Sequence, residues 1–122
     1  MDDTAGNITV SNNTITAAQT SNNYAVGLKG LSITNLVVSG NTITVTGNGA
    51  GDIRALSFAG STAVTVSGNT LSASGGTTNR AVYVGSSTIN AGSTGNTNSA
   101  GVCTNGGGNT GSVVFTNAAT CP

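Results

Sequence analysis

The chain is 122 residues long, and glycine, threonine, asparagine and serine account for 70 of them. It has three basic residues, three acidic residues, no histidine and no tryptophan, so its formal net charge is zero. This composition excludes imidazole-based metal sites and histidine triads, and three cations cannot neutralise a run of phosphates, so nucleic acid is a poor partner. The hydrophobic residues, 36% of the chain, recur at regular intervals, which indicates one folded domain rather than a disordered linker.

A seven-residue motif recurs at a constant spacing. Residues 10–16 (Val-Ser-Asn-Asn-Thr-Ile-Thr) return as residues 38–44 and again as residues 66–72, and both steps are 28 residues. A regular repeat of this length is typical of solenoids. A second apolar alternation follows each copy, at steps of 30 and 26, in residues 24–28, 54–58 and 80–84. The varying step predicts a surface loop of variable length within each repeat.

The apolar residues within each copy recur with a period of two, which predicts β-strands. The β-branched residues and the many glycines exclude helix, so no helical crossover can join parallel strands here. Each strand must instead pair with its equivalent one repeat later, about 4.8 Å away. The predicted fold is therefore all-β, a parallel β-helix (β-solenoid). It has about three full coils of ~28 residues in residues 1–91, then a degenerate last coil and cap in residues 92–122 of the same domain.

The motif Val-x-Val-Ser-Gly-Asn-Thr-Ile/Leu resembles the repeat of right-handed parallel β-helices, the pectate-lyase-like coils of bacterial surface and secreted proteins. The resemblance covers about residues 7–91. It implies a right-handed coil in which Asn13, Asn41 and Asn69 occupy tight turns, point inward and form a ladder. Asparagine suits this place because it tolerates a left-handed backbone and its amide both donates and accepts hydrogen bonds.

A second register competes with this one. Residues 82–89 also match residues 64–71 at a step of 18, which suits a tighter, left-handed solenoid with six-residue rungs. Two steps of 28 outweigh one of 18, so the right-handed coil is preferred. The residues predicted to fill its cross-section are Ile8, Val10, Ile15, Val26, Leu28, Val38, Ile43, Val45, Leu56, Phe58, Val64, Val66, Leu71, Val82 and Val84.

The cap contains both cysteines, Cys103 and Cys121. Because they lack metal-ligand spacing, one disulfide is favoured over two buried cytosolic thiols, and a disulfide implies an oxidising compartment. We therefore expect an extracellular or cell-surface protein whose signal peptide has been removed, or a fragment of one, because residues 1–10 lack the features of a signal peptide. No apolar run reaches the roughly 18 residues of a membrane span, so no membrane insertion is expected.

One group of charges invites a catalytic interpretation. Asp52, Arg54 and Arg80 are expected to lie together on the surface, while Asp2 and Asp3 fall in a frayed terminus. A lone carboxylate cannot act as both acid and base. A solvated ion pair is therefore favoured over a catalytic or sugar-binding cluster, and the sequence predicts no catalytic residue, no metal site and no cofactor.

The outward face of the repeated motif is a candidate binding surface. It stacks hydroxyl residues in a grid, interrupted by Ala18, that looks like the Thr-x-Thr face of solenoid ice-binding proteins. Threonine is also the residue that an exposed β-surface favours, so the purely structural interpretation is preferred. The members of the array are Thr14, Thr16, Thr42, Thr44, Thr46, Thr70, Ser72 and Ser74.

These patterns favour a non-catalytic structural or adhesive module of a secreted or cell-surface bacterial protein. Its expected partners are a second copy, stacked end to end into filaments, or a host or cell-surface glycan or protein. Ice binding through the threonine array is the alternative, and a glycan-binding or glycan-cleaving β-helix is a weaker one.

Overall fold

The computed structural model describes residues 6–21 and 23–117, which form eleven strands and no helix. The strands make three parallel sheets. Sheet A contains β1 (Gly6–Ser11), β4 (Thr34–Ser39) and β7 (Thr65–Ser67). Sheet B contains β2 (Thr14–Ala18), β5 (Thr42–Thr46), β8 (Thr70–Ser74) and β10 (Thr97–Ala100). Sheet C contains β3 (Tyr24–Leu31), β6 (Asp52–Ala59), β9 (Thr78–Gly85) and β11 (Val102–Asn105).

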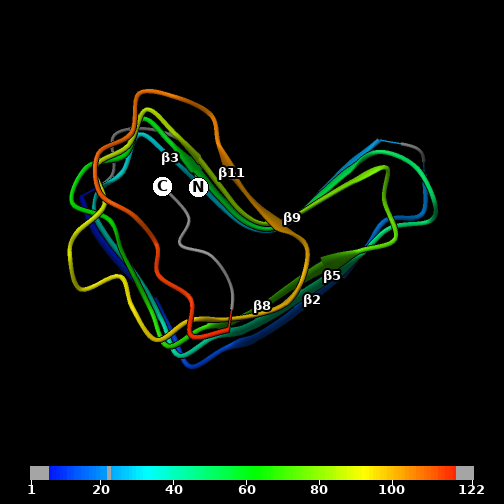
Figure 1. The fold of residues 1–122 in the computed structure, drawn as a ribbon, viewed down its shortest axis with the longest axis horizontal. Helices are drawn as coiled ribbons and strands as arrows, with labels where there is room; N and C mark the ends of the chain where they lie inside the picture. Colours follow the sequence, from blue (N-terminus) through cyan, green and yellow to red (C-terminus); the bar gives the residue numbers. More distant parts are fainter. Residues whose placement is uncertain (1–5, 22, 118–122) are drawn as a thin grey trace.

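Each of the first three turns contributes one strand to each sheet, so successive turns stack on one another. Figure 1 looks along this stack, and the outlines of the turns nearly superimpose. Every strand pair is parallel, as the pairing of β1 with β4 and of β4 with β7 illustrates. The chain is therefore a parallel β-solenoid of about three turns, and the predicted fold class is confirmed.

The strand register explains the repeat spacing and corrects two details of it. Val38 pairs with Val66, at the predicted step of 28. Tyr24 pairs with Asp52, also at 28, so the predicted step of 30 between the first two turns of sheet C is wrong. The shortening to 26 occurs one turn later, where Asp52 pairs with Thr78. Val64 bridges to Ile89 rather than to Val82, so the competing step of 18 is wrong as well.

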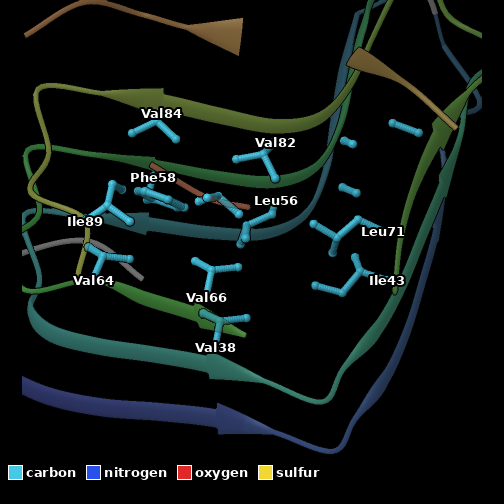
Figure 2. Packing of buried hydrophobic residues seen from close by; sticks show 14 of the residues in the cluster. Val38, Ile43, Leu56, Phe58, Val64, Val66, Leu71, Val82, Val84 and Ile89 are labelled. Atoms are coloured by element: carbon cyan, nitrogen blue, oxygen red, sulfur yellow. The ribbon is translucent and has the colours of Figure 1, made fainter. Parts of the chain in front are cut away.

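The core is a set of columns in which one apolar side chain lies over another. Leu56 pairs with Val82, and Phe58 pairs with Val84. Figure 2 shows these side chains pointing into the space that the strands enclose. The predicted core residues of the second and third turns are all buried, whereas Ile8, Ile15 and Leu28 of the first turn pack on the core but stay partly exposed. A turn at the end of the stack is covered on one side only.

Val26 is the one predicted core residue that belongs to an outward column. It pairs with Arg54, which in turn pairs with Arg80. The prediction placed it inside because the step of 30 aligned it with Leu56. The sequence analysis also missed several buried residues at corners and in the last turn, namely Ile33, Ile53, Ile89, Val113 and Phe115.

The asparagine ladder is present, and it is longer than predicted. The backbone N–H and the Nδ2 of Asn41 both donate to Oδ1 of Asn69, at 2.9 and 3.0 Å. Asn13 donates to Asn41 in the same way, at 2.9 and 3.1 Å, and Asn69 donates to a fourth member, Asn96, at 3.1 and 3.0 Å. Asn41, Asn69 and Asn96 are buried. Each asparagine side chain hydrogen-bonds to the asparagine of the next turn, so the polar groups buried at this corner all have partners.

The left-handed residue of each of these turns is the one before the ladder asparagine. Asn12, Gly40, Gly68 and Gly95 have φ values of 56°, 63°, 61° and 72°. The motif therefore reads Gly-Asn or Asn-Asn because glycine and asparagine adopt this conformation at low cost. The ladder position requires a side-chain amide for its hydrogen bonds, and the position before it requires a residue that adopts a positive φ.

The opposite corner, between sheets C and A, contains a second polar ladder that the sequence analysis missed. The N–H of Ile33 donates to Oγ of Ser61 at 3.2 Å, and the N–H of Ser61 donates to Oγ of Ser87 at 3.1 Å. The N–H of Ser87 donates to Oδ1 of Asn109 at 2.9 Å. Serine occurs throughout this chain, so two inward serines give no distinctive signal.

The last turn is shorter than the others and covers the end of the core. Thr110 bridges to Thr88 at a step of 22 residues, and Phe115 bridges to Asn96 at a step of 19. Figure 1 shows the red part of this segment crossing inside the outline of the earlier turns. Its own apolar residues Val113 and Phe115 are buried. Cys103 lies in β11 against the core, whereas Cys121 is outside the described residues, so their disulfide stays a prediction.

Replacing Asn41 by alanine should lower the free energy of unfolding by about 2–3 kcal/mol, because it leaves buried donors and acceptors of two turns unpaired. Asn13, at the exposed end of the ladder, is the matched control, and Asn13→Ala should cost less than about 1 kcal/mol. Denaturant unfolding followed by circular dichroism measures both values. Equal losses in the two variants would contradict the ladder as a stabilising element.

Candidate functional site

The charged residues that the structure describes all lie on the outer side of sheet C. Lys29 is on β3, Asp52 and Arg54 are on β6, and Arg80 is on β9. Both tyrosines, Tyr24 and Tyr83, belong to the same face. We call these six residues the charged face. With three cations and one anion it is net positive, whereas the described strands of sheets A and B carry no charged residue.

Strand register brings the predicted group of Asp52, Arg54 and Arg80 together. Arg54 and Arg80 are direct neighbours on adjacent turns. Nη2 of Arg54 lies 2.6 Å from Oδ2 of Asp52, and its Nε donates to the same oxygen at 3.0 Å. Nη1 of Arg80 forms an ion pair with Oδ1. Asp52 thus links two like charges that stacking forces side by side.

Tyrosine rings cover this ion cluster. The guanidinium carbon of Arg54 lies 4.0 Å from the ring centroid of Tyr83 and 5.0 Å from that of Tyr24. Arg80 lies 5.9 Å from Tyr83. The side chains of Arg54, Arg80 and Asp52 are only 17%, 20% and 27% exposed. The expected ion pair is present at the surface, but the tyrosine rings exclude part of the water around it, which strengthens its internal attraction.

The cluster has a fixed geometry but no group poised for proton transfer. Both oxygens of Asp52 are engaged by guanidinium groups, and Arg54 also donates to Oγ of Ser57 at 3.2 Å. Nε of Arg80 donates to Oγ1 of Thr104 at 3.0 Å. Tyr24 is 45% exposed at the edge of the cluster, and Lys29 is exposed. The arrangement can present cations and an aromatic ring to a partner.

The hydroxyl array occupies sheet B in unbroken register over three turns. Thr14, Thr42 and Thr70 form one column, and Thr16, Thr44 and Ser72 form the next. A third column contains Ala18, Thr46 and Ser74. The pairing then shifts between Asn98 and Ala100 of β10, so the fourth turn does not extend the grid. The array is regular and uncharged.

The described residues offer neither a metal site nor a membrane-spanning helix. The described residues contain no group of three or more side chains suited to holding a metal ion. No helix in this part of the chain is long and apolar enough to span a bilayer. Asp2 and Asp3 lie outside the described residues.

Comparisons with known proteins find no relative: no protein-family model, no curated protein and no solved structure matches the chain. The β-solenoid architecture therefore rests on the strand pairing described above.

Replacing Asp52 by asparagine should reduce the free energy of unfolding by about 1–2 kcal/mol, because Arg54 and Arg80 then repel each other without a carboxylate between them. The loss should shrink in high salt, which screens the repulsion. Adding Arg80→Gln to the same chain should restore part of the stability. Denaturant melts at two salt concentrations test this, and a salt-independent loss would contradict the electrostatic account.

Proposed function

We propose that this chain is a non-catalytic structural and adhesive module of a secreted or cell-surface protein, whose charged face contacts a partner. The observation that carries the proposal is the segregation of the described charged residues and both tyrosines on the sheet C face, while the described strands of sheets A and B carry no charge. Charges that served solubility alone would be spread over the surface. Arginine and tyrosine are also the side chains that dominate the energetics of binding interfaces.

Two features support a binding role over catalysis. The lone carboxylate of the charged face is tied to two arginines, and no second carboxylate lies beside it among the described residues. The ion cluster is fixed by stacking and hydrogen bonds within this chain, so the face is preorganised, which lowers the cost of binding. Its net positive charge favours an anionic partner.

Membership of the right-handed, pectate-lyase-like β-helix family is part of the same proposal. The inward asparagine ladder after a Gly-Asn turn supports it. End-to-end stacking into filaments has weaker support, because the shortened last turn covers the core at the C-terminal end. The location outside the cell follows from the predicted disulfide.

A glycan and protein array probed with the full chain tests the adhesive role. We expect binding to anionic spots, reduced about tenfold or more by Lys29→Glu combined with Tyr24→Ser, which removes an exposed cation and an exposed ring. Thr16→Lys on sheet B is the matched control and should bind as the wild type does. The same chain should release no product from the array's polysaccharides. Binding that survives the double substitution, or product release that Asp52→Asn abolishes, would overturn the proposal.

Ice binding through sheet B is a second candidate. The unbroken register of the three columns favours it, because it places neighbouring turns about 4.8 Å apart and alternate residues about 6.8 Å apart in a regular grid. Thermal hysteresis measures this activity directly. Thr44→Tyr, at the centre of the array, should abolish any hysteresis, whereas Lys29→Glu should leave it unchanged. A wild-type chain without hysteresis eliminates this candidate.

A further inference from the structure

The first three turns extend sideways into an arm that the fourth turn lacks. We define the arm as residues 19–23, 47–51 and 75–77, which connect sheet B to sheet C in successive turns; Asn22 is outside the described residues. Figure 1 shows the arm at the right of the view, and the fourth turn, in orange, passing from sheet B to sheet C without entering it. Gly101, with a φ of 103°, makes this short connection between β10 and β11.

The missing fourth arm leaves an open hollow of about 510 Å³ above the third. Val102, which is 58% exposed, lies at its edge. None of the lining residues is charged, and most are small. They are Ala73, Ser74, Gly75, Thr77, Thr78, Asn79, Ala100, Gly101 and Val102. We call this hollow the ledge.

Two backbone hydrogen bonds recur between successive arms, and the ledge exposes the groups that would continue them. The N–H of Gln19 donates to O of Thr46, and one turn later the N–H of Gly47 donates to O of Ser74. The N–H of Asp52 likewise donates to O of Asn23, and that of Thr78 donates to O of Gly51. The equivalent groups of the third turn are the N–H of Gly75 and the C=O of Thr77. Among the described residues neither has a backbone partner.

We propose that the ledge binds an extended, glycine-rich segment of a partner protein, which adds as a strand where the fourth arm would lie. An unpaired backbone edge beside a hollow is the geometry of strand addition, in which main-chain hydrogen bonds supply affinity and side-chain fit supplies specificity. The segment accepts a hydrogen bond from Gly75 and donates one to Thr77. Val102 packs against an apolar side chain beside it.

Successive arms approach each other closely, and a segment that stacks on the third arm must therefore be rich in glycine. A Cβ on Gly51 would lie 1.7 Å from O of Asn23 in the arm below. A Cβ on Gly75 would lie 2.6 Å from O of Gly47, and one on Gly76 would lie 2.8 Å from O of Gly51. These are overlaps with backbone, so each arm needs glycine at these positions to stack on the arm below. A segment that stacks on the third arm meets the same requirement.

The same geometry disfavours occupants from this chain. The ledge lies beside β10 and β11, at the level of the fourth turn, so the arm of a second copy could reach it only if that copy's other strands overlapped the fourth turn. Residues 118–122, Ala-Ala-Thr-Cys-Pro, contain no glycine. A free strand of a partner meets neither obstacle.

A nine-residue peptide with the sequence of residues 45–53, the second arm, is a suitable probe. We expect saturable binding to the full chain, measured by titration and by hydrogen exchange, with new protection of the Gly75 amide. The control peptide has alanine in place of Gly51, whose Cβ would overlap the arm below, and it should bind about tenfold more weakly or not at all. Equal binding of both peptides, or no binding of either, overturns the proposal.

Two protein variants locate the binding. Val102→Glu places a charge at the edge of the ledge and should weaken binding about tenfold. A chain in which Gly-Asn-Gly-Ala-Gly replaces Gly101 builds a fourth arm over the ledge and should abolish binding. Unchanged exchange of the Asn41 amide shows that each variant is folded. If the chain alone forms a dimer that Val102→Glu dissociates, the occupant is a second copy and the proposal of a partner protein is wrong.

Discussion

The structure depends on one constraint: each turn lies about 4.8 Å from the next, so every position in the outline must accept the same kind of residue in turn after turn. In the interior, apolar columns such as Phe58 over Val84 meet this requirement. Polar corners are harder, because a buried backbone group must find a partner in the adjacent turn. Asn41 and Ser61 provide these partners through ladders, and both residues are buried.

The same constraint explains how much of the fold the sequence could predict. Constant spacing of the Val-Ser-Gly-Asn motif was sufficient for the strands, their parallel pairing and the ladder positions Asn13, Asn41 and Asn69. Sheet C was harder to align, since its apolar residues match equally well two positions apart, and Val26 was placed in the core for that reason. Short sequence motifs cannot distinguish two strand registers that differ by two residues, whereas the backbone pairing of the structure does.

The candidate site shows where sequence reasoning reaches its limit. The proximity of Asp52, Arg54 and Arg80 could be inferred from their places in successive turns. Their partial desolvation could not, because it depends on the rings of Tyr83 in β9 and Tyr24 in β3, which lie 4.0 and 5.0 Å from Arg54. The ledge was equally hidden. It exists because the fourth turn has no arm, and no residue pattern in the sequence indicates this.

The tapered last turn has a consequence for how such a protein changes in length. Its steps of 22 and 19 residues fit only beyond the third turn, while the turns before it share a nearly constant outline. A duplicated unit of 28 residues would therefore be accommodated between the second and third turns without disturbing either terminus of the stack. Gene duplication could lengthen the rod, and its outer surfaces with it, one layer at a time.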